Sequence, residues 1–307
     1  MIELIKKQKL LSILLIFVLV FDIFVATMAL IPAKKDITTP GGLNEVKAVI
    51  EVDTDTTLNG SFNTIYVYSM ERVSLLQAWI ASLANYNEVS DSSQTVHLSD
   101  DERIKSGQVQ KNQSIEASLI CAYNQANKTD HNIKIDYQFC GYIISNYQIN
   151  NEIFKIGDLI TNVYDSSSNQ NFDISIRKEL ANAISNLSIN DKITIVRDSE
   201  IKEITVDKEF NNDNLNLFSC YQKYQIHNEK TNPSYTLHKS STSGPSGGLL
   251  QTLSIYSQII GKDLTYGKKI AGTGTINVEG KVGKIGGVSQ KIVTAIHNNA
   301  DVFMYVL

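Results

Sequence analysis

The chain has 307 residues, which is enough for one large domain or two modest domains that each have a hydrophobic core. Its 28 lysines and arginines nearly balance its 32 aspartates and glutamates, so the formal net charge of -4 gives no basic stripe for a nucleic acid. The sequence has no HExxH motif, Cys/His ligand cluster, EF-hand loop or P-loop, and we therefore expect no metal and no other cofactor.

The first predicted element is a membrane-spanning helix over residues 10–31, which follows a short cytoplasmic stub, residues 1–9. The helix is almost continuously apolar, and about 20 such residues cross a bilayer. Positive charge stays on the cytoplasmic side, so the lysines of the stub place the rest of the chain outside the cell. A cleaved secretory signal is the alternative, because residues 26–29 are small enough for cleavage, although the apolar stretch exceeds the roughly 7–15 residues of a signal core.

A proline- and glycine-rich stretch, residues 32–44, is expected to link the membrane to the exported part. The segment 45–130 then alternates between strand-like and helix-like patterns. We expect Trp79 to pack in a core. We expect strands at 45–52 and 60–68, amphipathic helices at 69–83 and 114–126, and an irregular surface segment at 85–111.

The middle segment, 133–207, indicates a β-rich domain with one helix near 176–187. The order of its elements resembles that of a circularly permuted bacterial PDZ domain, and its Ile-Gly-Asp-Leu-Ile turn at 156–160 matches that family. The resemblance implies that a loop of four residues receives a peptide terminus and that the next strand edge accepts an added strand. These four residues are Phe139, Cys140, Gly141 and Tyr142. A generic β-rich domain is the alternative.

The three cysteines, Cys121, Cys140 and Cys220, are far apart and in no CxxC spacing. An odd number cannot pair completely within one chain. We interpret them as buried or free thiols, with a disulfide as the alternative.

A glycine-rich loop, Ser243-Gly244-Pro245-Ser246-Gly247-Gly248, runs directly into a helical pattern over 249–260. Ser246 therefore stands at a helix start, where free N–H groups and the positive helix end stabilise a developing negative charge. Such donors are worth roughly 3–4 kcal/mol each in a hydrolase. A serine at this place is also a common helix cap, and the loop alone favours that interpretation.

A second glycine-rich motif runs from Gly272 to Lys291 and contains Gly-Thr-Gly-Thr-Ile and Ile-Gly-Gly-Val-Ser-Gln-Lys. The two motifs together resemble the proteolytic domain of the Lon family, specifically its PDZ-containing, membrane-anchored branch, over about residues 235–306. The resemblance implies that Ser246 is the nucleophile, that Lys291 is the general base and that the hydroxyl of Thr273 lies near that base. It also implies that Gly244, Pro245 and Gly247 form an oxyanion or substrate loop.

A lysine can serve as this base only if burial lowers its pKa from near 10.4 to roughly 7–8. The apolar neighbours of Lys291 in the sequence, such as Val288 and Ile292, are expected to provide that burial. No histidine is needed in such a dyad.

The resemblance implies an α+β fold in which a PDZ-like β-rich domain, 133–207, is inserted into a Lon-type proteolytic domain that one transmembrane helix precedes. Residues 45–130 and 208–307 supply the protease fold, and the second segment is expected to be C-terminally short, since such domains continue past the equivalent of 302–306.

The function that we expect is that of an ATP-independent serine endopeptidase, single-pass in the cell membrane, that cleaves exported peptides or unfolded proteins. A catalytically weak, membrane-anchored PDZ protein that binds peptides is the alternative. Lon relatives often form rings, so the resemblance leaves open whether this chain forms a homo-oligomer.

Overall fold

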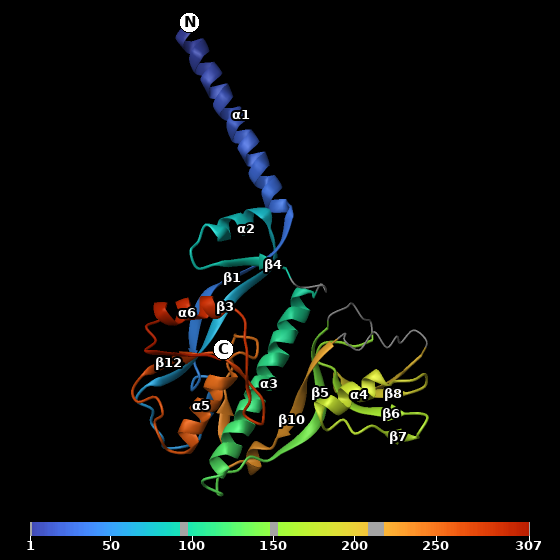
Figure 1. Cartoon of the computed structure of the whole chain (residues 1–307). Helices are drawn as coiled ribbons and strands as arrows, with labels where there is room; N and C mark the ends of the chain where they lie inside the picture. The colour runs from blue at the N-terminus through green and yellow to red at the C-terminus, as the bar shows by residue number, and fades with distance from the viewer. Residues whose placement is uncertain (1, 93–97, 148–152, 208–217, 307) are drawn as a thin grey trace. The chain divides into compact units, whose positions relative to one another are not determined.

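The computed structural model describes residues 2–92, 98–147, 153–207 and 218–306 (Figure 1). Residues 208–217, at the start of the expected proteolytic segment, lie outside the described residues. The chain forms two compact units, each assembled from three segments. The first unit comprises Met1–Gly41, Val67–Ser93 and Gly287–Thr294, and the second comprises Gly42–Tyr66, Gln94–Gly286 and Ala295–Leu307.

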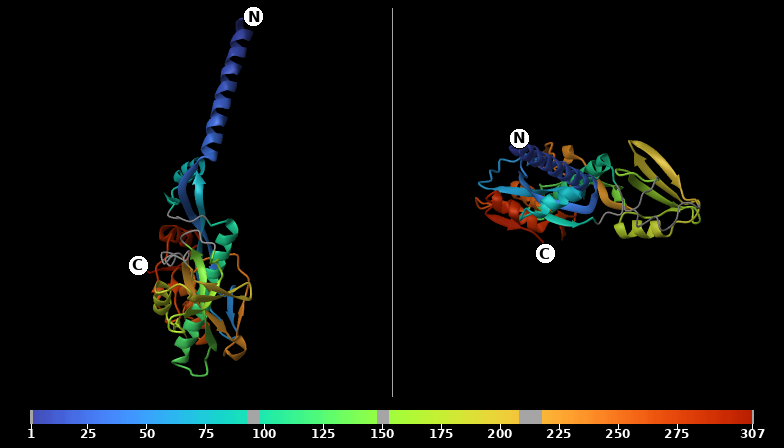
Figure 2. Two further views of the ribbon diagram at one scale, coloured as in Figure 1. Left: turned by 90° about the vertical axis from the view of Figure 1, so that its right-hand side faces the viewer. Right: turned by 90° about the horizontal axis from the view of Figure 1, so that it is seen from above.

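The first unit begins with the apolar helix α1 (Ile2–Leu30), which is one uninterrupted helix in the views of Figure 2. Its residues Gln8–Leu30 are long and apolar enough to cross a membrane, a property that membrane spans share with signal sequences.

The chain continues from α1 into strand β1 (Pro32–Glu45), so the segment 32–44, which was expected to link the membrane to the exported part, is a strand. Lys35–Thr38 pair antiparallel with strand β4 (Glu88–Asp91). This pairing satisfies the backbone groups that a loop would leave to water, and it outweighs the local signal of the prolines and glycines.

Strand β3 (Ser61–Ser74) runs further than the sequence pattern predicted and leads into helix α2 (Leu75–Ser82). The hydroxyl of Ser74 accepts a hydrogen bond from the Gln77 N–H, and the Gln77 side chain accepts one from the Ser74 N–H. This capping box fixes the start of the helix, which is therefore shorter than predicted.

The second unit is built around helix α3 (Asp100–Asn127), which packs along helix α5 (Gly248–Ile259). A capping box of Ser99 and Glu102 starts α3, so residues 100–111 are helical and the expected irregular segment is wrong there. The first turns of α3 are polar and exposed, so they lack the apolar periodicity by which the sequence reveals a helix.

The second unit also contains strands that pair in parallel. Strand β12 (Lys269–Gly272) pairs in parallel with the beginning of β3 and with β15 (Val302–Met304). Helices α3 and α5 and these strands share one hydrophobic core. Its fully buried members include Leu119, Ala122, Tyr123, Leu250 and Ile255.

A separate core lies in a six-stranded antiparallel sheet that helix α4 (Arg177–Ser185) covers. The order of the sheet is β10-β5-β6-β8-β9, and a short strand, β7, pairs with β6. The bounds are β10 (Phe218–Ile226), β5 (Tyr137–Tyr147), β6 (Leu159–Asp165), β7 (Gln170–Asn171), β8 (Lys192–Arg197) and β9 (Glu200–Thr205).

The sheet extends beyond the expected domain, because its edge strand β10 comes from beyond residue 207. The Gly157-Asp158 turn is held by Asp158, whose carboxylate accepts hydrogen bonds of 2.8 and 2.6 Å from the guanidinium of Arg197.

The remaining elements of the second unit are short. Strand β2 (Ile50–Val52) pairs with β11 (Tyr235–Leu237), β13 (Thr275–Ile276) pairs with β14 (Val282–Gly283), and η2 is one turn at Asn228–Lys230. Helix α6 (Val288–His297) begins in the first unit and ends in the second.

Candidate active site

Ser246 lies half-buried on the loop that precedes α5. Gly247 is the N-cap of this helix and supplies no side-chain cap, so Ser246 is not the helix cap. Within the described part of the chain, the N–H groups of Ser246 and Gly247 donate no hydrogen bond. Free N–H groups at a helix N-terminus can stabilise an oxyanion.

Main-chain hydrogen bonds fix this loop to the strand segment that contains Thr273. The carbonyl oxygen of Ser246 accepts from the Gly274 N–H at 2.8 Å and from the hydroxyl of Thr273 at 3.1 Å. The carbonyl oxygen of Gly274 in turn accepts from the Leu249 N–H at 3.0 Å. The structure therefore brings Ser246 and Thr273 together through the Ser246 carbonyl, and it ties the loop on both sides of the serine.

Helix α3 supports the loop from another side. The hydroxyl of Ser114 donates to the Pro245 carbonyl at 3.0 Å and lies 3.3 Å from Oε1 of Gln251. The hydroxyl of Ser118 lies 3.1 Å from the Gly248 carbonyl oxygen. These polar residues were not predicted from the sequence. The available signal was the spacing of Ser114 and Ser118, four residues apart on the buried face of a helix.

Two adjacent glycines have different neighbours. A Cβ on Gly248 would lie 2.7 Å from the Cγ2 and 2.9 Å from the backbone N of Ile276, so no side chain fits between the loop and the strand. A Cβ on Gly247 would meet the side chain of Thr64 at 2.9 Å. Gly244 has a positive φ of 87°, which glycine adopts without the strain that a side chain would cause, so this position of the loop also favours glycine.

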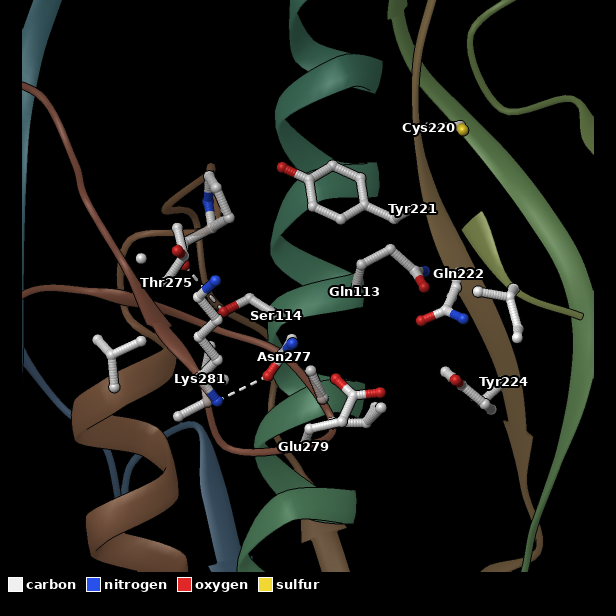
Figure 3. A pocket seen from close by; sticks show the side chains of 17 residues that line it. Gln113, Ser114, Cys220, Tyr221, Gln222, Tyr224, Thr275, Asn277, Glu279 and Lys281 are labelled. Atoms are coloured by element: carbon white, nitrogen blue, oxygen red, sulfur yellow. Dashed lines mark hydrogen bonds between the residues drawn. The ribbon is translucent and has the colours of Figure 1, made fainter. Parts of the chain in front are cut away.

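A pocket of about 460 Å³ lies beside the loop, and Pro245 is part of its wall (Figure 3). Tyr221, Gln222 and Tyr224 face it from strand β10, opposite the hairpin of β13 and β14. Its remaining wall combines aliphatic side chains, such as Ala117 and Val282, with polar and charged side chains. A pocket that combines an apolar lining with a few amide and hydroxyl groups suits a peptide side chain.

Lys291 lies in the part of α6 that belongs to the first unit. Its side chain is 4% exposed, and burial lowers its pKa to about 8. Thr294, one turn further, accepts a hydrogen bond of 3.0 Å from the Gly41 N–H and so attaches the helix to β1. With a pKa of about 8, roughly a fifth of the Lys291 side chains are neutral at about pH 7.4, and the neutral form is the state that a general base needs.

The four residues expected to form a carboxylate-binding loop lie inside strand β5, so the expectation of a loop is wrong. Phe139 is opposite Tyr224, Gly141 is opposite Lys223, and Tyr142 lies between Gln222 and Ile160. The register shifts between Lys223 and Tyr224, so Cys140 has no partner in the ladder with β10. The glycine is needed because a Cβ on Gly141 would lie 2.1 Å from the Ile160 carbonyl oxygen.

The cysteines are free thiols, with Cys220 buried and Cys121 and Cys140 half-buried, as the sequence predicted. Among the described residues, no group of three or more His, Cys, Asp and Glu side chains could hold a metal ion.

Residues 212–305 match the family model of the Lon protease (S16) C-terminal proteolytic domain. Comparison with curated proteins and with solved structures found no match. The matched segment contains the serine loop, the Thr273 segment and Lys291. The match covers less than half of the chain, and it supports a Lon-like serine protease.

Proposed function

We propose that this chain is a membrane-anchored, ATP-independent serine endopeptidase in which Ser246 is the nucleophile and Lys291 is the general base. The family match supports the protease class, and both residues stand at the positions that the two glycine-rich motifs assign to them.

The observation that carries the proposal is the burial of Lys291, which lowers its pKa to about 8. Burying a lysine costs free energy, because the charged form loses its hydration. Strongly shifted pKa values of this kind gather at functional sites, and an ordinary structural lysine avoids the cost by reaching solvent.

The proposed reaction follows acyl transfer. Neutral Lys291 takes the proton from the Ser246 hydroxyl, and the oxygen attacks a peptide carbonyl. The N–H of Gly247 donates to the oxyanion, and the lysine then gives its proton to the leaving amine. Water releases the acyl group by the same steps, with Lys291 again as the base.

We also propose that the pocket beside Pro245 receives the substrate. It is continuous with the serine loop, and strand β10 of the six-stranded sheet forms one of its walls. The order of elements in this sheet supports a PDZ-like module that holds an extended peptide. The proposed location is outside the cell membrane, with α1 as a single-pass anchor, and the lysines at the start of α1, before its apolar stretch, support this orientation.

The test uses the full chain in detergent micelles with an unfolded protein substrate and a serine-reactive fluorophosphonate. Labelling and cleavage are expected in the wild type, and both are lost in Ser246→Ala. Lys291→Ala loses cleavage, whereas the control Lys284→Ala, an exposed lysine of the same motif, keeps it. If the wild type neither cleaves nor becomes labelled but still binds peptide, the chain is the binding protein of the alternative hypothesis.

A further inference from the structure

We propose that helix α2 lies in the interface of the bilayer that α1 crosses, with Leu76, Trp79, Ile80 and Leu83 turned toward the lipid. The proposal rests on α1 staying in the membrane as an anchor, and it does not depend on the proteolytic chemistry.

The first observation is the outer face of α2. Trp79, Ile80 and Leu83 are 57%, 55% and 68% exposed, contrary to the expectation that Trp79 packs in a core. Together with Leu76 they recur at intervals of three and four residues, so they form one stripe along the helix. An exposed stripe of large apolar side chains on a short helix indicates a surface that contacts something apolar.

The opposite face of α2 is already used. Ala81 is buried against Ile37 and Val73, and Ala78 packs on the same cluster. This small-residue face holds α2 on strands β1 and β3 within the first unit. The helix is thus apolar on two sides, and its fold explains only one of them.

The identity of the partner follows from where α2 begins. The Leu75 N–H donates a hydrogen bond of 2.9 Å to the carbonyl oxygen of Ile31, the residue directly after the end of α1. The start of α2 is therefore fixed at the end of the apolar span, where hydrocarbon gives way to head groups. Tryptophan prefers this depth because its ring is apolar and its N–H is polar. An interfacial helix buries its apolar face about 5–10 Å deep.

The chain supplies its own probe, because Trp79 is its one tryptophan. The full chain is reconstituted in phosphatidylcholine vesicles, with or without lipids brominated in the upper acyl chain, and flotation verifies that α1 anchors it. We expect bromolipids to quench at least half of the Trp79 fluorescence, and iodide to quench it several-fold less than it quenches free tryptophan. Full iodide access without bromolipid quenching would overturn the proposal.

Protection from both quenchers would also overturn it, because protein rather than lipid would then cover the stripe. A variant that keeps Trp79 but carries Ile80→Asn and Leu83→Asn is expected to lose at least half of the bromolipid quenching. Both side chains are exposed, so the fold does not depend on them. Ser82→Asn, on the flank of the same helix, is the matched control and should quench like the wild type. Unchanged quenching in the double variant would show that the stripe does not hold the helix in lipid.

Discussion

Ser246 and Lys291 stand in surroundings of opposite kinds. The serine is half-buried on a loop that hydrogen bonds fix to helix α3 and to the Thr273 segment, and its reactivity depends on position. The lysine is buried in α6, and its reactivity depends on the loss of hydration that lowers its pKa. The two groups should therefore respond to different changes. Displacement of its loop should affect the serine, whereas pH and nearby charge should affect the lysine.

The largest expected effect is on turnover when the base is removed. Lys291→Met keeps the length of the side chain but has no amine, so it removes the proposed acceptor of the Ser246 proton. We expect kcat/KM for an unfolded protein substrate to fall roughly 1,000-fold or more. The control Lys284→Met should retain activity within about twofold, and equal losses in both variants would refute a specific role for Lys291.

The same variant should gain stability in a pH-dependent way. Below about pH 8 the lysine is charged in both the folded and the unfolded state, so its burial destabilises the fold. As pH rises from about 8 to 10.4, the unfolded chain holds the proton longer than the folded chain, and wild-type stability increases relative to the variant. The difference between the folded pKa of about 8 and the unfolded pKa of about 10.4 corresponds to about 3 kcal/mol in the free energy of unfolding.

Denaturant unfolding of both proteins at pH 7 and pH 10.5 measures this difference. Lys291→Met is expected to be the more stable protein by about 3 kcal/mol at pH 7, and most of the gain should vanish at pH 10.5. A gain that is the same at both values would contradict the pKa of about 8.

Displacement of the serine loop should have the next largest effect on turnover. Gly248→Ala forces a methyl group against the Ile276 backbone, and overpacking of this kind costs about 1–3 kcal/mol. A shift of the serine by about 1 Å can reduce turnover about 100-fold. The methyl group of Gly247→Ala meets side-chain atoms of Thr64 and Gln251 and no backbone atom, so we expect less than a tenfold loss of kcat. Steady-state kinetics of the pair checks the order, and a larger loss in Gly247→Ala would be inconsistent with this account.

The smallest effect is expected at Ser114. Ser114→Ala leaves the Pro245 carbonyl without its side-chain donor, which costs about 1–3 kcal/mol for a buried group. We expect kcat to fall about tenfold while the pKa in the pH profile stays the same, because the lysine is untouched. Ser106→Ala removes a buried hydroxyl elsewhere on α3 and serves as the control. A shifted pKa in Ser114→Ala would show that the serine loop and the lysine are not prepared independently.

The sequence predicted those features that depend on local pattern. The Gly-Pro-Ser-Gly-Gly loop before α5 and the buried Lys291 could be identified because glycines and an apolar helix face leave a strong signal. The strand at 32–45 could not, because its pairing with β4 comes from a distant segment and overrides local proline and glycine.

Two further failures have physical causes. The carboxylate-binding loop was assigned to residues 139–142 from the resemblance to PDZ domains, whereas these residues form part of strand β5 and the glycine allows the close approach of strand β6. Trp79 was expected in a core because helical spacing shows that a face is apolar but does not show which of two apolar faces the protein buries.

The most direct test of the central claim is the pH dependence of Ser246 acylation by a fluorophosphonate. If neutral Lys291 activates the serine, as we propose, the second-order labelling rate should rise about tenfold per pH unit and level off near pH 8, and in Lys291→Met it should lose this inflection and fall at least 100-fold. An unchanged rate and inflection in Lys291→Met would contradict the assignment of Lys291 as the base.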